Sequence, residues 1–463
     1  MTTADMVTPL AAFLDGALGV PGHEVRSLVR LSGGASRETF AFEVLPPDGG
    51  PARALVLQRV RGGSVMASAS MAGEAGLLRA ADRRGVAVAS VVASSDDPAV
   101  LGAPFIVMAH VEGETLARKI LRDDPFAEAR PLLVRQCAAA LAGIHALPLD
   151  AATHLRADDP VGQLVGLLDV LGEPHPAFEL AVRWLEANRP APAEPRVVHG
   201  DFRLGNLMVG PDGLRAVLDW ELAHLGDPME DLGWLCVRAW RFGQPLPVAG
   251  LGTYEELFAA YAEVTGAPVD ADAVRWWEVL GTLRWGVICI LQTSGHLTGA
   301  SRSVELAAIG RRIVENEYDI LRLLGVDADA PTSVPAAAAA AAAADADARG
   351  FDAGPHDAPS APQLVEAVRE YLERDVLGAT TGRVQFHARV AAKVLATVER
   401  ELAMGPAIAA AHRDRLAALG FADDAALAAA IRAGDVADRT DEISAAVAAA
   451  VSDKLAVANP DYA

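Results

Sequence analysis

Cysteine is scarce in this sequence. The 463 residues include three cysteines, Cys137, Cys236 and Cys289, and no two of them form a Cys-x-x-Cys pair. A disulfide framework and a cysteine zinc site both need cysteines in pairs, so neither is expected. The three thiols are therefore predicted to be small buried apolar groups in a reduced protein.

Positive charge and long apolar runs are also in short supply. Lys and Arg total 40 against 61 Asp and Glu, a formal net charge of −21. Such a chain repels nucleic acid and anionic membrane surfaces, although a local basic pocket for a phosphorylated ligand stays open. No apolar run approaches the roughly 18 residues that span a bilayer, and the first residues lack the pattern of a signal peptide. We expect a soluble cytoplasmic protein without nucleic-acid or membrane partners.

One low-complexity segment divides the chain. Residues 331–362 contain nine consecutive alanines between prolines, with few side chains that could form a core, so they are predicted to be a linker. The length, about three times that of a typical domain, also favours two or three domains. Residues 363–463 carry alanine, leucine and valine at helical spacing and are predicted to form an all-α domain.

The part before the linker changes from strand-like to helix-like patterns. Residues 25–60 carry alternating or continuous apolar stretches bounded by glycine and proline, which is typical of strands, and residues 68–84 are predicted to be a helix. From about residue 114 onward helical spacing dominates. This order predicts an α+β fold with two lobes, the first over residues 1–112 and the second over residues 113–330.

A cluster of polar residues surrounds a predicted β-hairpin. Two apolar runs flank a Pro-Asp-Gly turn and predict the hairpin over residues 207–218. Asp201 and Asn206 come before it and Asp219 comes at its end, so these three side chains are expected to lie close together. Two oxygen ligands and a separate carboxylate are what Mg²⁺-assisted phosphoryl transfer needs.

The motifs around this hairpin resemble those of the aminoglycoside phosphotransferase-like kinases. The chain has HGDxxxxN from residue 199, LDWE from residue 218 and GDPxxDLGW from residue 226. The resemblance implies a two-lobed protein-kinase-like fold, with a nucleotide-binding first lobe of antiparallel sheet and helix and a mainly helical catalytic and substrate lobe. It also implies a kinase that uses ATP or GTP with Mg²⁺ and phosphorylates a hydroxyl group of a small molecule.

The resemblance assigns roles position by position. Asp201 would be the catalytic base, and Asn206 and Asp219 would hold Mg²⁺. His199 would brace the catalytic loop by hydrogen bonding, or else be a packed histidine without chemistry. Arg203 is a further catalytic candidate in the same loop.

Three more acidic residues lie near these motifs. Glu221 is close enough in sequence to Asp219 to join the metal site. Asp227 and Asp231 each come before an apolar run and are expected to cap the N-terminus of a helix.

Two segments of the first lobe resemble nucleotide-binding elements. LSGGASRETF, from residue 31, is similar to a glycine-rich phosphate loop, in which Gly33 and Gly34 would let backbone N–H groups approach phosphates and Ser36 would donate a further hydrogen bond. PFIVMAHVEGETL, from residue 104, is similar to the hinge between lobes. The backbone of Ala109–Val111 would bind the adenine edge and Met108 would line its pocket. The alternatives are a plain turn at the two glycines of the loop and a core position for Met108.

The chain departs from the family at one position. The family has Lys or Arg at the end of the third strand, facing the phosphates, where this sequence has Gln58. Arg59 follows, but adjacent strand residues face opposite sides, so Arg59 could replace that cation only through a bulge. Glu74 matches the helix glutamate that pairs with the cation, and beside Gln58 it is expected to lack a charged partner. These residues leave three alternatives: Arg59 substitutes, nucleotide binding is unusual, or the chain is a weakly active nucleotide-binding scaffold.

The substrate is indicated by resemblance alone. The motifs are most similar to the kinase-like domain fused to some acyl-CoA dehydrogenases, which implies a hydroxyacyl-CoA or a similar hydroxylated metabolite; aminoglycosides and choline are the alternatives. A CoA ester would need nearby cations, for which the candidates are Arg203, Arg238, Arg241 and Arg284.

The helical tail resembles a domain of unknown function appended to bacterial proteins of this type. LVEAVREYLERDVL and FHARVAAKVLATVEREL are the segments that carry the resemblance. Regulation, formation of a homodimer and covering of the active site are the roles considered for it.

Overall fold

The computed structural model describes residues 2–31, 37–61, 70–157, 159–328 and 358–462. The chain separates into two compact units. The first comprises Met1–Asp158 and Pro190–Glu278, and the second comprises Asp159–Arg189 and Val279–Ala463. The boundaries proposed from the sequence for two lobes, a linker and a helical domain stay a prediction, and the proposed linker lies outside the described residues up to position 357.

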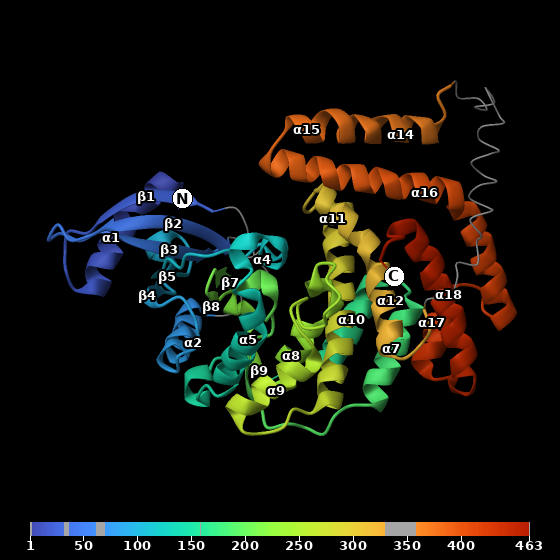
Figure 1. The fold of residues 1–463 in the computed structure, drawn as a ribbon, viewed down its shortest axis with the longest axis horizontal. Coiled ribbons are helices and arrows are strands. Elements are labelled where there is room, and N and C mark those ends of the chain that lie inside the picture. Colours follow the sequence, from blue (N-terminus) through green and yellow to red (C-terminus); the bar gives the residue numbers. More distant parts are fainter. Residues whose placement is uncertain (1, 32–36, 62–69, 158, 329–357, 463) are drawn as a thin grey trace. The chain divides into compact units, whose positions relative to one another are not determined.

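The first unit contains a five-stranded sheet, drawn in blue and cyan in Figure 1. The strands are β1 (Glu24–Arg30), β2 (Arg37–Leu45), β3 (Arg53–Val60), β4 (Val91–Ser95) and β5 (Phe105–Ala109). Their spatial order is β1-β2-β3-β5-β4, and every neighbouring pair is antiparallel. The antiparallel sheet predicted for the first lobe is therefore confirmed.

Each face of this sheet is covered by a helix. α1 (Thr3–Leu18), which the sequence analysis had not assigned, begins at a capping box between Thr2 and Asp5. Its apolar stripe packs on one face together with side chains of β2 and β3, namely Met6, Leu10, Leu14, Phe40, Phe42, Leu55 and Leu57. α2 (Met71–Arg83) contributes Met71, Ala75 and Leu78 to the core that includes Ile106 and Met108 of β5. The alternation of side chains along a strand separates the two faces.

Helices and two small sheets complete the first unit. The helices are α3 (Pro98–Leu101), α4 (Ala117–Arg122), α5 (Arg130–His145), α8 (Met229–Cys236) and α9 (Tyr254–Thr265). One small sheet pairs β6 (Arg196–Val198) with β9 (His224–Gly226), and the other pairs β7 (Leu207–Gly210) with β8 (Gly213–Val217). The pair β7–β8 confirms the predicted hairpin. The N–H of Leu218 bonds to the carbonyl of Asn206 at 2.8 Å, which holds the two ends of the hairpin together.

The second unit is helical. It contains α6 (Pro160–Leu171), α7 (Pro176–Ala187), α11 (Val304–Ile309), α12 (Ile313–Leu323), α14 (Ala361–Tyr371), α15 (Leu377–Ala379), α16 (Gly382–Leu419), α17 (Asp424–Ala433) and α18 (Thr440–Ala458). A further long helix, α10 (Ala271–Leu297), begins in the first unit's sequence range and ends in the second's. The predicted helical nature of the C-terminal region is confirmed.

The C-terminal helices share one core with helices that precede the predicted linker. Val314, Tyr318 and Leu321 of α12 pack in the same apolar cluster as Leu427 of α17 and Val447 of α18. An ion pair strengthens the contact between α17 and α7, because the Arg432 guanidinium donates to both carboxylate oxygens of Glu179 at 2.8 and 2.6 Å. The tail is thus packed onto α7 and α12 within the second unit.

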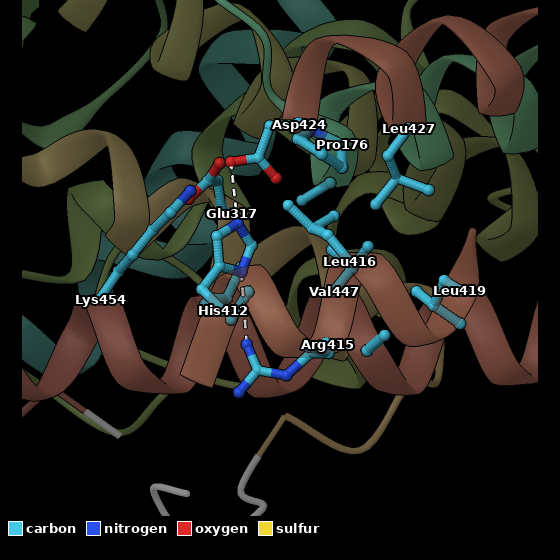
Figure 2. Close-up of a pocket in the computed structure, with 14 residues that line it drawn as sticks. Pro176, Glu317, His412, Arg415, Leu416, Leu419, Asp424, Leu427, Val447 and Lys454 are labelled. Carbon is cyan, nitrogen blue, oxygen red and sulfur yellow. Dashed lines mark hydrogen bonds and ion pairs between the residues drawn. The ribbon is translucent and has the colours of Figure 1, made fainter. Parts of the chain in front are cut away.

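A network of partly buried charged and polar side chains surrounds the buried carboxylate of Glu317 beside this core. Figure 2 shows His412 between Asp424 and Arg415, and Lys454 beside Glu317. Glu317 accepts a hydrogen bond from His175 at 2.9 Å and contacts Lys454 at 3.4 Å. Burial opposes the charge on Glu317, but the ammonium group of Lys454 and the hydrogen bond from His175 outweigh burial and lower the pKa of Glu317 to about 2.

The scarce features of the sequence have simple structural outcomes. All three cysteines are buried and free, and burial raises the pKa of Cys137 and Cys289 to about 12. They are therefore the inert core thiols that were predicted. Among the described residues, no helix combines the length and the apolar character that crossing a bilayer requires.

Candidate active site

The carboxylate of Asp201 is held by three donors. Asp201 lies between β6 and β7 in the first unit. Its Oδ1 accepts hydrogen bonds from Arg203 Nε at 3.0 Å and from Trp234 Nε1 at 2.9 Å, and its Oδ2 accepts one from Asn206 Nδ2 at 2.6 Å. A carboxylate oriented in this way can accept a proton from a hydroxyl group in a fixed direction. Trp234, which the sequence analysis did not single out, belongs to the GDPxxDLGW segment.

Asp219 lies at the other end of the hairpin in an electronegative setting. Burial and the nearby carboxylates of Glu221 and Asp201 raise its pKa to about 6, although Arg37 acts in the opposite direction. Its backbone is in the left-handed region, with φ of 61°, which turns the chain directly after β8. A buried carboxyl that is destabilised by other carboxylates is a favourable place for a cation.

Asn206 and Asp219 fit a magnesium ion by the chemistry of their donors. The side-chain nitrogen of Asn206 bonds to Asp201, both at its carboxylate and at its backbone oxygen, so the side-chain oxygen of Asn206 is the donor left for a cation. Mg²⁺ takes one or two protein oxygens and fills its other positions with phosphate and water. In the described part of the chain, no group of three or more His, Cys, Asp or Glu is placed to hold a metal.

His199 has the contacts of a brace. The ring is fully buried, and burial lowers its pKa, which favours the neutral form. Its Nδ1 accepts the backbone N–H of Asp201 at 3.2 Å, so Nε2 carries the proton and donates to the carbonyl of Leu218 at 3.0 Å. The imidazole thereby connects the catalytic loop to the residue before Asp219.

Asp231 of α8 anchors the loop that contains His199, Gly200 and Asp201. Its carboxylate accepts the backbone N–H groups of His199 at 2.7 Å and Gly200 at 2.9 Å, and contacts His145 Nε2 at 3.0 Å. Burial opposes its charge, but these hydrogen bonds outweigh burial and lower its pKa. The expectation that Asp231 caps a helix is therefore wrong. Asp227 does make a capping contact, since it accepts the N–H of Met229 in the first turn of α8 at 2.9 Å.

Glu74 has a charged partner, and it is Arg37. The guanidinium of Arg37 on β2 forms two parallel bonds to the Glu74 carboxylate on α2, at 2.7 and 2.6 Å, and its Nε lies 3.3 Å from Glu221. Both partners are buried, and the carboxylates around Arg37 overcome its desolvation and raise its pKa. The prediction that Glu74 lacks a charged partner is wrong. Its partner is Arg37 on β2, whereas the family's usual cation lies at the end of the third strand.

The register of β2 and β3 explains why Arg37, and not Arg59, lies on the same face of the sheet as Gln58. It runs without a shift from Arg37 opposite Val60 to Val44 opposite Arg53, so Gln58 lies on the same face as Arg37. Arg59 lies on the other face, where its Nε bonds to Glu38 at 3.1 Å and its Nη1 bonds to the carbonyl of Leu101 at 2.7 Å. The alternative in which Arg59 replaces the missing cation therefore fails.

Comparison with known proteins agrees with this geometry. Residues 27–276, more than half of the chain, match the phosphotransferase enzyme family. The chain belongs to this family. Residues 378–462 match a domain of unknown function, DUF6285.

Relatives of the chain include mammalian acyl-CoA dehydrogenase family members. It is 28% identical over 333 residues to mouse acyl-CoA dehydrogenase family member 10, covering 65% of this chain and 30% of that protein. It is 27% identical over 292 residues to mouse family member 11, covering 58% of this chain and 36% of that protein. The chain thus spans about a third of the length of these relatives.

A solved structure supports the fold. A Ralstonia eutropha protein assigned as an aminoglycoside phosphotransferase superposes with a TM-score of 0.55 at 22% identity, covering 68% of this chain and 98% of that one. The predicted kinase-like fold is therefore confirmed.

The predicted nucleotide-binding segments of this phosphotransferase are described only in part. Gly33, Gly34 and Ser36 lie outside the described residues. At the predicted hinge, the N–H of Ala109 donates to the carbonyl of Ser90 at 2.9 Å and the N–H of His110 donates to the carbonyl of Ala54 at 3.1 Å, so both of these N–H groups already have partners within the chain. Val111 follows the strand and packs at the edge of the core, to which Met108 also belongs. Met108 therefore has the core position that was its alternative.

The candidate cations for a phosphorylated substrate are placed differently from one another. Arg203 touches Asp201, and its guanidinium lies over the Trp240 ring, 5.0 Å from the centroid. Arg241 bonds to Glu278 at 3.0 Å and to the carbonyl of Cys236. Arg284 belongs to the second unit. Arg203 is therefore placed directly at the Asp201 carboxylate.

Proposed function

We propose that the chain transfers the γ-phosphoryl group of ATP or GTP to a hydroxyl group of a small metabolite. The observation that carries the proposal is the Asp201 carboxylate, held by three donors beside Asn206 and Asp219. In this reaction the hydroxyl oxygen bonds to the γ-phosphorus, the bond to the β-phosphate oxygen breaks, and the hydroxyl proton goes to Asp201. Magnesium held by Asn206 and Asp219 would neutralise charge on the phosphates.

Arg37 supplies, in this proposal, the charge that the family has at Gln58. It lies on the same face of the sheet as Gln58, it pairs with the matching glutamate, and it acts electrostatically on Asp219. One unit charge at contact distance corresponds to about 1–4 kcal/mol, depending on the local dielectric. The alternative of a weakly active scaffold rested on the missing cation at Gln58, and a cation supplied by Arg37 would weaken that alternative.

The substrate class that we favour is a hydroxyacyl-CoA or a similar hydroxylated metabolite. The support is the similarity to acyl-CoA dehydrogenase family members, together with the position of Arg203 beside the catalytic carboxylate. An aminoglycoside or choline acceptor is the alternative; the Ralstonia eutropha protein of similar fold is assigned as an aminoglycoside phosphotransferase. Fold alone does not decide between them.

The decisive test is a transfer assay with the whole chain. Purified protein is incubated with ATP or GTP and Mg²⁺ against hydroxyacyl-CoA esters, choline and aminoglycosides, and phosphorylated product is measured. We expect Asp201→Asn to lower turnover by roughly 100- to 10,000-fold. The matched control is Asp212→Asn, which removes an exposed carboxylate from the turn of the same hairpin. If no acceptor is phosphorylated in a manner that depends on Asp201, the proposal fails.

Nucleotide binding can be tested separately from transfer. A ligand that binds the folded state raises its apparent stability, so ATP or GTP with Mg²⁺ should raise the melting temperature. A rise without transfer to any acceptor would revive the scaffold alternative. If neither nucleotide raises the melting temperature, both the phosphotransferase proposal and the scaffold alternative are contradicted.

A further inference from the structure

In the proposed transfer, the base Asp201 and the metal ligand Asp219 lie on two separate loops. The catalytic loop follows β6 and carries Asp201, and residues 219–223 after β8, called the metal loop below, carry Asp219. The two loops must keep one relative position, because a misplacement of about 1 Å can cost about 100-fold in rate. His199 of the catalytic loop bonds to the carbonyl of Leu218, directly before the metal loop. The contacts at the other end of the metal loop come from positions that the three sequence motifs leave open.

His224 holds the far end of the metal loop. Its Nδ1 donates to the carbonyl of Leu222 at 2.9 Å, and its Nε2 donates to the Glu230 carboxylate at 3.0 Å. A neutral imidazole has one N–H, so two acceptors require the doubly protonated ring. Burial opposes this charge, but the hydrogen bond and the charge of Glu230 outweigh burial and raise the pKa of His224 to about 9. The ring is therefore a cation at neutral pH, held between the two acceptors.

The strand pairing places His224 directly beside the catalytic loop. Val198, the last residue of β6, pairs with His224, the first residue of β9. Gly200 of the catalytic loop has φ of 75°, and a Cβ there would collide with the Leu222 carbonyl oxygen and lie 3.2 Å from His224 Nδ1. The bond from His224 to Leu222 thus lies where the catalytic loop and the metal loop touch.

Two adjacent carboxylates of α8 hold the two loops. Asp231 accepts the backbone N–H groups of His199 and Gly200 in the catalytic loop. Glu230, the residue before it, accepts from His224 and so reaches the metal loop. Both carboxylates belong to buried residues. The first turn of α8 is therefore a common anchor for the base and for the metal ligand.

We propose that His224 and Glu230 are positioning residues that keep the metal loop in place against the catalytic loop. This inference deepens the phosphoryl transfer proposed above and rests on it. His224 acts through the carbonyl of Leu222, three residues after Asp219, and Glu230 acts through His224. Residues that hold a metal ligand through an intermediate group change metal affinity or activity by about 10–100-fold when they are mutated.

The first test measures the Mg²⁺ dependence of transfer with the full-length chain. His224→Phe keeps a ring and removes both hydrogen bonds, so the Mg²⁺ concentration for half-maximal turnover should rise about 10–100-fold, with a smaller change in the KM for the acceptor. His224→Gln keeps N–H donors and should lose less. The matched control is His387→Phe in the second unit, because the ring of His387 is about as exposed as that of His224 and also bonds to a glutamate.

The second test separates positioning from stability. His224→Phe removes the imidazolium from the buried Glu230 carboxylate and should lower the melting temperature, whereas adding Glu230→Gln removes that negative charge and should recover part of the loss. Because Glu230 acts through His224, the double variant should keep the full Mg²⁺ defect of His224→Phe, and the two effects on Mg²⁺ should not add. If the Mg²⁺ dependence recovers together with the melting temperature, the pair is structural and the proposal fails.

Measurements without turnover keep this proposal separate from the proposed function. Hydrogen exchange of residues 199–206 and 218–226 should rise in His224→Phe, because a bond between the two loops is lost. If the wild type transfers no phosphoryl group to any acceptor, the proposed function fails, and the rise in melting temperature on adding Mg²⁺ then replaces turnover as the measure of the metal loop. Unchanged exchange in both segments overturns the positioning role, as does a response to Mg²⁺ that is the same in His224→Phe and in the wild type.

Discussion

Two buried carboxylates, one in each unit, have opposite electrostatic surroundings. Asp219 is surrounded mainly by other carboxylates, and burial with these neighbours raises its pKa to about 6. Glu317 is even more completely removed from water, yet Lys454 and His175 lower its pKa to about 2. The second unit thus contains a closed ion network that stabilises the fold, whereas the first contains a carboxylate whose charge still needs a cation. Burial alone does not distinguish a functional acid from a structural one, but the sign of its neighbours does.

The largest change in unfolding free energy should come from removing Arg37, the cation that pairs with Glu74 in the first unit. Arg37→Gln leaves Glu74 buried without its partner, and breaking a buried pair costs about 3–5 kcal/mol of unfolding free energy. The double variant Arg37→Gln with Gln58→Arg places a cation on the same face, one strand away, and should recover part of the stability and of the nucleotide-dependent thermal shift. The control is Arg59→Gln, on the opposite face. Equal nucleotide shifts in wild type and Arg37→Gln would contradict the assignment.

Glu317→Gln should break the network of the second unit. We expect a loss of about 3–5 kcal/mol, because His175 and Lys454 lose their buried counter-charge. Since the folded pKa lies below the ordinary value of 4.5, this stabilisation is present above pH 4.5 and is lost as the pH falls towards 2. Hydrogen exchange in α7, α12 and α18 measures the effect. Unchanged protection in these helices would show that the contacts of Glu317 with His175 and Lys454 contribute nothing to stability.

Asp219→Asn should stabilise the folded state in the absence of metal, whereas Glu317→Gln should destabilise it. A folded pKa raised from 3.8 to about 6 means that ionisation destabilises the folded state as the pH rises through this window. The variant should therefore be more stable by about 2–3 kcal/mol at pH 8, at 1.36 kcal/mol per pKa unit. Chemical denaturation at pH 4 and pH 8, with and without Mg²⁺, measures this difference. Stabilisation of the variant by Mg²⁺ to the same degree as the wild type would show that Asp219 is not a ligand.

The smallest effect should come from Trp234→Phe. This change removes one of three donors to Asp201 and keeps most of the ring's packing, so we expect roughly a 10-fold loss of turnover, which corresponds to about 1.4 kcal/mol. Trp277→Phe, which removes a comparable bond to Asp227, is the matched control. A shift of the pH profile of turnover in Trp234→Phe alone would show that the bond orients the base rather than only the fold.

Local sequence patterns predicted what depends on neighbours in the chain. The hairpin over residues 207–218, the ordered motifs around it and the helical tail all follow from short-range spacing. The Arg37–Glu74 pair was missed because its members are 37 residues apart and join a strand to a helix. The role of Asp231 was missed because its partners, His199 and Gly200, lie about 30 residues earlier, and a capping residue looks the same in sequence.

The amino-acid sequence by itself determined the family, the alternation of strand and helix, and the residues that carry oxygen ligands for phosphoryl transfer. These are encoded in periodicity and in motifs of fewer than 40 residues. Only the tertiary structure decided which cation faces Glu74, which carboxylate has mainly other carboxylates around it and which helices cover the C-terminal tail. Charge and burial depend on residues that are brought together from distant parts of the chain, so their balance is set by the folded structure.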